Sequence, residues 1–228
     1  MIGTIINAVL VLIGGGLGLL LRKGIPDRVK DTVMQGLSLV VIVIGLSGAL
    51  KTQDMLGMII CIVIGGLMGS LIDIEKRLDQ LGAFAEKKLG GEDGSVSKGF
   101  VTASLVFCVG AMAIVGSLDS GLRGDHSTLI AKGVIDAVTA MFFASALGAG
   151  VLLSAAAIFV YQGAIALLAG LLSPALTDVV ITEMSAVGGL LIAGVGINLM
   201  STLHIKVGNL LPAIFLPMAY VPIAALLG

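Results

Sequence analysis

The sequence predicts an all-α polytopic membrane protein, and three observations lead to that fold class. The 228 residues are 57% hydrophobic and 12% charged, and their mean hydropathy is +1.15. A soluble domain has about a quarter charged residues, so a soluble fold of this size would expose far more apolar surface than such proteins do. The apolar residues also gather into runs of bilayer-spanning length, which is about 20 residues each. A helical bundle embedded in the bilayer follows.

Eight apolar runs meet this length, so we expect about eight transmembrane helices, or seven if one run is re-entrant. The runs are 3–21, 29–50, 55–73, 99–118, 128–148, 150–172, 179–203 and 207–226. The short connections leave no room for a soluble domain, so we treat residues 1–228 as one integral membrane domain. Arg22 and Lys23 follow the first run, whereas a cleavable signal peptide carries its basic residues in front. We therefore expect the first run to be retained.

The basic residues predict the orientation of the chain. When the connections are numbered alternately, ten of the 13 Lys and Arg residues fall on one side. The other side receives Lys51, Arg123 and Lys132. The basic side contains the connections 22–30 and 73–98, which we expect to be cytoplasmic. Eight spans would then place both termini outside.

The longest hydrophilic stretch, 76–98, is predicted to hold an amphipathic helix and a linker. Ile74, Leu78, Leu81 and Ala85 recur at helical spacing, with charged residues between them. This pattern is typical of a solvated or interfacial helix. The sequence "GGEDGSVS" that follows predicts a flexible linker.

Two distant segments share a pattern that suggests an internal repeat. Pro26 and Pro174 each stand near the start of an expected helix, where proline is favoured. Gln35 and Glu183 each follow nine residues later. The glycines Gly45 and Gly196, and then Gly57 and Gly208, continue the match. Spans 1–3 (residues 1–75) would then repeat as spans 6–8 (151–228), around the central spans of 99–150.

A repeat shifted by five spans would insert its two copies in opposite directions, as in many secondary transporters. Nine helical residues cover roughly 13 Å, which is near half of a hydrocarbon thickness of about 30 Å. We therefore expect Gln35 and Glu183 to meet near the midplane of the bilayer.

Two acids, Asp136 and Glu183, fall inside apolar runs. A charged group inside a membrane is costly and is by default a functional candidate. Each acid also has a structural explanation. Asp136 could pair with Lys132 one helical turn earlier, and Glu183 could be an interfacial residue favoured by the positive end of its own helix.

Amide side chains accompany these acids on most of the expected spans. A single amide in a span often bridges helices for about 1 kcal/mol, but a structural bundle does not need so many. The candidate substrate- or ion-binding residues are therefore Asp136, Glu183, Gln35, Gln162, Asn198, Asn209 and Asn7.

Two segments are expected to be broken or kinked helices, near 108–121 and 208–222. The first contains Gly110 and Gly116, and the second contains Pro212 and Pro217. Proline inside a helix frees carbonyl groups, which coordinate cations and substrates in transporters with broken helices. Simple kinking by the prolines and close helix packing at the glycines are the alternatives.

Several motifs resemble one bacterial inner-membrane family across essentially the whole chain. They include "GTIINAVLVLIGGGLGLLL", "KGIPDRVKDTVMQGL", "VFCVGAMAIVGSLDSGL", "KGVIDAVTAMFFASALGAGV", "VYQGAIALLAG" and "ITEMSAVGGLLIAGVGINLM". The family is catalogued as domain of unknown function 554. The resemblance implies a multi-pass protein of the bacterial cytoplasmic (inner) membrane that is usually interpreted as a transporter. It implies no substrate and no established site.

We therefore predict a secondary transporter of a small solute, such as an amino or organic acid, coupled to H⁺ or Na⁺. Na⁺ would bind at Asp136 or Glu183, and no other metal and no cofactor is expected. The alternative is an oligomeric channel, and the many glycines favour a homo-oligomer in either case. Motifs for an enzyme or a basic surface for nucleic acid are not visible in the sequence. The expected partners are the lipid bilayer, the solute and the coupling cation.

Overall fold

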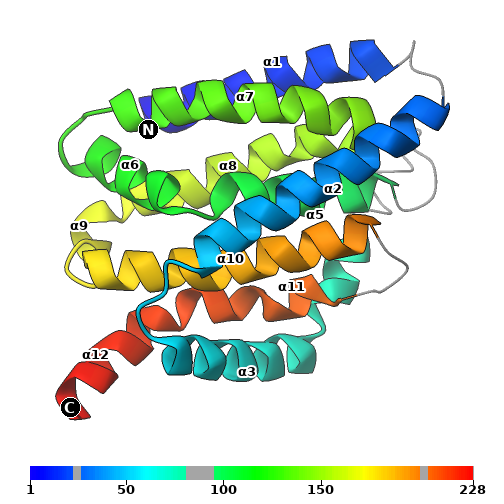
Figure 1. Ribbon diagram of the computed structural model, residues 1–228. Helices are drawn as coiled ribbons and strands as arrows, with labels where there is room; N and C mark the ends of the chain where they lie inside the picture. The colour runs from blue at the N-terminus through cyan, green and yellow to red at the C-terminus, as the bar shows by residue number, and fades with distance from the viewer. Residues whose placement is uncertain (23–26, 81–94, 201–204, 228) are drawn as a thin grey trace.

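The computed structural model describes residues 1–22, 27–80, 95–200 and 205–227, and the described residues form helices without any strand. The elements, drawn in Figure 1, are α1 (Ile2–Arg22), α2 (Asp27–Ala49), α3 (Met55–Ile72), α5 (Ser95–Cys108), α6 (Ala111–Leu122), α7 (Ser127–Leu147), α8 (Gly150–Leu167), α9 (Ala169–Leu172), α10 (Asp178–Met200), α11 (Val207–Leu210), the 3₁₀ helix η1 (Leu211–Phe215) and α12 (Pro217–Leu227). The all-α polytopic fold class is confirmed.

Six of the described helices are long and apolar enough to cross a membrane, namely α1, α2, α3, α7, α8 and α10. Two further segments are bent pairs: α5 meets α6 at 64°, and α11 with η1 meets α12 at 45°. The first pair crosses the whole bundle beside α8. Gly99 of α5 faces Val151 at the start of α8, and Gly121 of α6 faces Ala166 near its end. The contacts therefore fit eight crossings.

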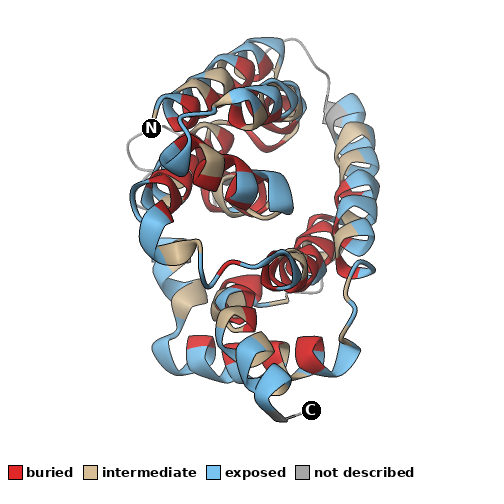
Figure 2. Ribbon diagram, turned by 90° about the vertical axis from the view of Figure 1, so that its left-hand side faces the viewer, coloured by how far each residue is buried: buried red, intermediate tan, exposed pale blue. Residues whose placement is uncertain are grey.

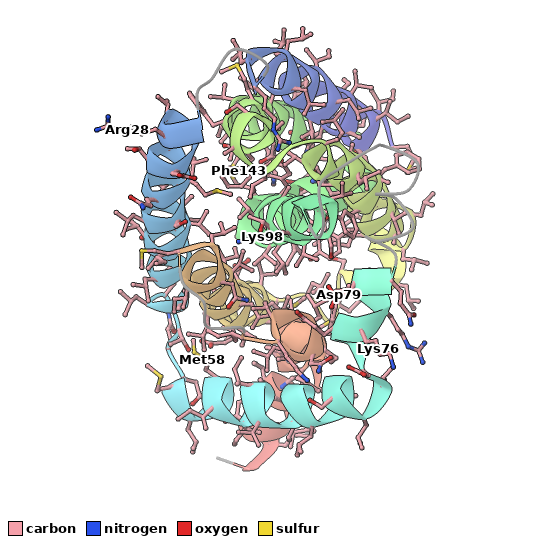
Figure 3. The ribbon with its side chains drawn as sticks, turned by 90° about the vertical axis from the view of Figure 1, so that its right-hand side faces the viewer. Arg28, Met58, Lys76, Asp79, Lys98 and Phe143 are labelled. Atoms are coloured by element: carbon pink, nitrogen blue, oxygen red, sulfur yellow. The ribbon has the colours of Figure 1, made fainter. Side chains whose placement is uncertain are left out.

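Both chain termini lie at one end of the bundle, which we call the terminal end (Figure 1). The opposite end carries Arg28, Lys76 and Lys98, which are labelled in Figure 3, and we call it the basic end. An even number of crossings requires the two termini to share an end. The structure and the predicted charge asymmetry therefore agree on the course of the chain.

Glycines let neighbouring helices approach until their backbones touch. A Cβ on Gly14 of α1 would lie 2.0 Å from the carbonyl oxygen of Ala137 in α7, and one on Gly18 would lie 2.2 Å from that of Met141. In the same way Gly45 of α2 lies against the backbone of Ala193 in α10. Small residues of this kind commonly form helix interfaces in membranes. These glycines serve contacts within the chain, and a homo-oligomer stays a prediction.

The helices form two groups, visible in Figure 2. The α7 group contains α1 and α5–α8, in which α1 runs parallel to α7. The α10 group contains α2, α3 and α10–α12, in which α2 runs antiparallel to α10. The two groups meet along a seam, where α5 and α6 face α10 and α2 faces α7. The protein therefore has two densely packed parts joined by a thinner contact.

The spans that the sequence pairs as repeats lie side by side. Gly15 of α1 faces Leu152 of α8, and Gly65 of α3 faces Ala213 of η1, while α2 packs on α10. Each pair runs antiparallel, as an inverted repeat requires. Alternating spans impose the same directions, however, so the internal repeat stays a prediction.

The breaks expected near 108–121 and 208–222 are confirmed. The first lies at Gly110, whose φ of 136° suits glycine, and the second lies between Phe215 and Pro217, with Pro212 inside η1. The expectation of a break at Gly116 is wrong, because α6 continues through it. A Cβ there would lie 3.0 Å from Leu129 of α7, so this glycine serves helix packing.

The predicted surface helix and linker are covered only in part. Residues 74–80 are helical, as expected, and α5 begins at Ser95, earlier than the predicted span. The rest of the linker, 81–94, and Pro26 lie outside the described residues.

Candidate functional site

Four polar side chains lie together in the core of the α7 group, and we call them the buried polar cluster. Asn7 comes from α1, Lys132 and Asp136 come from α7, and Gln162 comes from α8. Asn7 and Gln162 are 0% exposed, Asp136 is 5% exposed and Lys132 is 7% exposed. Gly133 allows the approach of α1, because a Cβ there would lie 3.0 Å from the Cα of Asn7. A small residue on α7 thus brings the amide beside the acid.

The cluster connects three spans by polar contacts. Asn7 Nδ2 donates a hydrogen bond to Gln162 Oε1 over 3.3 Å, and the same side chain lies close enough to the Asp136 carboxylate to act on it. Lys132 and Asp136 form a buried ion pair one helical turn apart, as their spacing suggested. The Asn7 amide is therefore the link between the ion pair and α8.

Several polar atoms in this region have no hydrogen-bond partner. They are Asn7 Oδ1, Gln162 Nε2 and, one turn earlier on the buried face of α1, Thr4 Oγ1. An unpartnered buried polar group costs about 1–3 kcal/mol, and native structures rarely keep one without a reason. The cluster can therefore accept a further polar species.

The break in α5–α6 lies near this cluster. Cys108, the last residue of α5, is close enough for the charges of Lys132 and Asp136 to act on its thiol. Asp136 is nine residues into α7, roughly 13 Å along the helix, which is near the centre of the bilayer. The ion pair and the broken span thus occupy similar depths.

A cavity of about 410 Å³ opens at the seam beside the same break. Gly110 and Ala111 line it from the α7 group, and Ser47 and Ser185 line it from the α10 group. Lys51 and Thr182 add polar atoms, while Val43, Ile44 and Ile192 make the rest of the wall apolar. This volume and mixed lining suit a small polar solute.

Glu183 has different surroundings at the terminal end of the α10 group. It is 5% exposed and lies in the second turn of α10. Its carboxylate accepts hydrogen bonds from Thr52 Oγ1 over 2.5 Å and from the Gln53 N–H over 2.8 Å. Both donors lie in the connection between α2 and α3, so Glu183 holds that connection against α10.

Asp54 extends this network to α12. Its carboxylate accepts from the Gly57 N–H over 2.9 Å, which caps α3, and from the Tyr220 hydroxyl over 2.8 Å. The Gly57 N–H first, and then the Tyr220 hydroxyl, lower the pKa of Asp54 below its ordinary value. The network of Glu183, Thr52, Asp54 and Tyr220 ties together α10, the α2–α3 connection and α12.

The expectation that Gln35 and Glu183 meet near the midplane is wrong. Pro174 precedes α10, which begins at Asp178, so Glu183 lies close to the helix end. The antiparallel packing of α2 on α10 then places Glu183 beside Thr52, at the far end of α2 from Gln35. Gln35 is exposed and lies eight residues after the start of α2 at Asp27, in the half of that helix nearer the basic end. The count of nine residues from Pro174 overestimated the depth of Glu183, because Pro174 lies before the first residue of α10.

The two remaining amides make structural contacts at the basic end. Asn198 Oδ1 accepts a hydrogen bond from the Ile205 N–H over 2.8 Å, and Asn198 Nδ2 donates one to the Ile205 carbonyl over 2.7 Å. Asn209 Oδ1 accepts from the Glu75 N–H over 2.8 Å, and Glu75 Oε2 in turn accepts from the Gly208 N–H over 2.5 Å. The structure thus separates them from Asp136, Asn7 and Gln162.

Sequence reasoning missed Thr4 and used Lys132 only as a structural partner for Asp136. The signal for Thr4 was its position three residues before Asn7, which puts both on one helix face. Within the described residues, no three His, Cys, Asp or Glu side chains gather as ligands for a metal. A cation at the cluster would use carboxylate and amide oxygens, which suit hard cations such as Na⁺.

Comparison with known proteins places the chain in a family. The model of a family described as "Protein of unknown function (DUF554)" matches residues 2–222. The chain belongs to this family. It is 32% identical over 222 residues to "Uncharacterized membrane protein YdfK" of Bacillus subtilis (strain 168), covering 95% of this chain and 94% of the relative.

A second DUF554 relative is "Uncharacterized protein YqgA" of Escherichia coli (strain K12). It is 33% identical over 224 residues, which is 95% of this chain and 94% of the relative. No solved structure matches the chain. Together with the apolar spans, the relatives support a multi-pass bacterial membrane protein.

Proposed function

We propose that this DUF554 protein is a secondary transporter of a small polar solute, coupled to H⁺ or Na⁺. The observation that carries the proposal is the buried polar cluster: an ion pair inside the membrane, next to amides that keep unpartnered atoms. The seam cavity has a volume of about 410 Å³ and a lining of both polar and apolar residues. This lining favours an amino or organic acid as the solute.

A purely structural role explains this cluster poorly. Replacing a buried ion pair with well-packed apolar side chains is often neutral or stabilising, and charges inside a bilayer cost several kcal/mol. The unpartnered atoms of Asn7 and Gln162 add to that cost. A side-chain set that lowers stability in this way is better explained by binding than by folding.

The arrangement of the helices supports a carrier that exposes its site alternately to the two sides. The two helix groups meet along a thinner seam, and the break at Gly110 lies on it beside the cavity. Discontinuous helices near the midplane and two parts that rock against each other are common features of secondary transporters. Motion at the seam would open the cavity first to one end and then to the other.

The test is uptake into proteoliposomes that contain the purified chain, with labelled amino and organic acids and an imposed H⁺ or Na⁺ gradient. We expect saturable uptake that follows one gradient and falls at least 100-fold in Asp136→Asn. The matched control is Asp119→Asn, which removes an acid whose partner is the exposed Arg123 at the terminal end. This control should transport like the unchanged protein.

Two results would contradict a carrier. Absence of gradient-dependent uptake across the tested acids would remove the proposal. A conductance in planar bilayers that does not saturate and does not respond to Asp136→Asn would favour the channel instead.

A further inference from the structure

The buried polar cluster contains an amide that can face its neighbours with either of two groups. The Asn7 NH₂ group donates a hydrogen bond to Gln162 Oε1, and the same side chain lies beside the Asp136 carboxylate. Its own Oδ1 has no partner. Rotation of the amide would exchange the two groups and bring three oxygens together. Those oxygens repel one another unless a cation lies between them.

We infer that Asp136, Asn7 and Gln162 form a binding site for a small monovalent cation such as Na⁺, and that the Lys132 ammonium is a tethered competitor for it. Na⁺ is a hard cation and prefers carboxylate and amide oxygens. The cluster contributes one carboxylate, so one monovalent charge balances it, whereas a divalent ion would leave a buried excess charge. The inference rests on the proposed function, because it names the ion that would be coupled to transport. Binding of the ion can be measured without any transport.

Lys132 is placed so that it can leave the carboxylate. It lies in the second turn of α7, one turn closer to the terminal end than Asp136. Lysine side chains in membrane helices extend along apolar surface and place their charge toward the nearer water layer. When a cation takes the carboxylate, the Lys132 ammonium can therefore move toward the terminal end. The site holds one of the two cations at a time.

The unpartnered oxygen of Asn7 fits this exchange better than it fits a fixed ion pair. In the lysine-bound arrangement Asn7 Oδ1 and Gln162 Nε2 both lack partners. With a cation bound, Asn7 Oδ1 gains a ligand contact and the free ammonium no longer occupies the carboxylate. A fixed structural pair would give no reason for the amide oxygen to remain unpaired.

The experiment is equilibrium binding of ²²Na⁺ to the full-length chain purified in detergent, at one fixed pH. We expect weak binding by the unchanged protein and at least about tenfold tighter binding by Lys132→Met, which is about 1.4 kcal/mol. Lys132→Arg keeps a tethered cation and should bind as weakly as the unchanged protein. Asp136→Asn should lose specific binding. Lys76→Met, which removes an exposed lysine at the basic end, is the matched control and should bind like the unchanged protein.

A stability measurement keeps the test valid if Lys132→Met folds poorly. Na⁺ should raise the unfolding temperature of this variant relative to choline at equal ionic strength, because a ligand that binds the folded state stabilises it. The inference is overturned if Lys132→Met binds ²²Na⁺ no more tightly than the unchanged protein and is not stabilised by Na⁺. Solute uptake that depends on H⁺ alone, without ²²Na⁺ binding, also overturns it but leaves the transporter intact. Binding of ²²Na⁺ without any uptake supports the site and removes the transporter.

Discussion

Asp136 and Glu183 are both buried carboxylates on membrane helices, but their surroundings differ. Glu183 receives two hydrogen bonds from the connection between α2 and α3. Asp136 forms an ion pair with Lys132 of its own helix, and the neighbouring amides of Asn7 and Gln162 retain unpartnered atoms. The first arrangement is complete and fixes a loop, while the second leaves capacity for another species.

This difference shows that the depth of an acid in the membrane does not reveal its role. The number of its polar neighbours that remain unsatisfied is more informative, because a completed network gains nothing from a ligand. Substitutions at the two acids and at the residues around them test this contrast.

The largest expected effect is on the unfolding free energy, and it tests whether the fold needs the ion pair of Lys132 and Asp136. Asp136→Leu alone removes the partner of the Lys132 ammonium, which then either stays buried without a counter-charge or leaves its packed position, and should cost up to about 3–5 kcal/mol of unfolding free energy. The double variant Lys132→Met with Asp136→Leu should return to within about 1 kcal/mol of the unchanged protein. Unfolding in mixed detergent micelles measures both. A double variant as unstable as Asp136→Leu would mean that the pair is needed for the fold.

The second prediction concerns the completed network. Glu183→Gln removes a charged acceptor from Thr52 and Gln53 and should cost about 1.5–3 kcal/mol, with uptake retained once the protein is folded. The same micelle unfolding measures the loss, and transport assays measure the retained uptake. Asp178→Asn, an exposed acid in the first turn of the same helix, is the control and should change stability much less. Loss of uptake without loss of stability would reverse the assignment of Glu183.

The third prediction tests the unpartnered amides. Asn7→Leu combined with Gln162→Leu removes both unpartnered atoms and the hydrogen bond between the two residues. Removing both partners of a buried contact is nearly neutral or stabilising, so unfolding should change by less than about 1 kcal/mol while uptake falls. A marked loss of stability would instead show that these amides act as structural links.

The smallest effect is the response of the α3 cap to acid. The Gly57 N–H and the Tyr220 hydroxyl lower the pKa of Asp54 in the folded protein. Asp54 therefore contributes stability above its unfolded pKa, and this contribution disappears as the pH falls through the lower folded value. Thermal unfolding below about pH 4 should be less acid-sensitive in Asp54→Asn. An unchanged acid response in this variant would assign the effect to other groups.

The sequence predicted the spans well because the length and apolarity of a run determine whether it crosses a bilayer. The break at Gly110 and the pairing of Lys132 with Asp136 were also visible, since both depend on local spacing. The partnership of Asn7 with Gln162 and the contact of Glu183 with Thr52 were not visible. Both depend on which helices become neighbours, and glycine contacts between backbones decide that.

The packing of α1 also has a consequence for biosynthesis. Gly14 and Gly18 of α1 meet the carbonyls of Ala137 and Met141 in α7, and Gly45 of α2 meets Ala193 in α10. α1 and α2 therefore leave the ribosome before their closest partners, which lie in the second half of the chain. They must wait in the lipid with these glycine surfaces uncovered until the later helices are inserted, so assembly of the bundle has to be completed after most of the chain has been made.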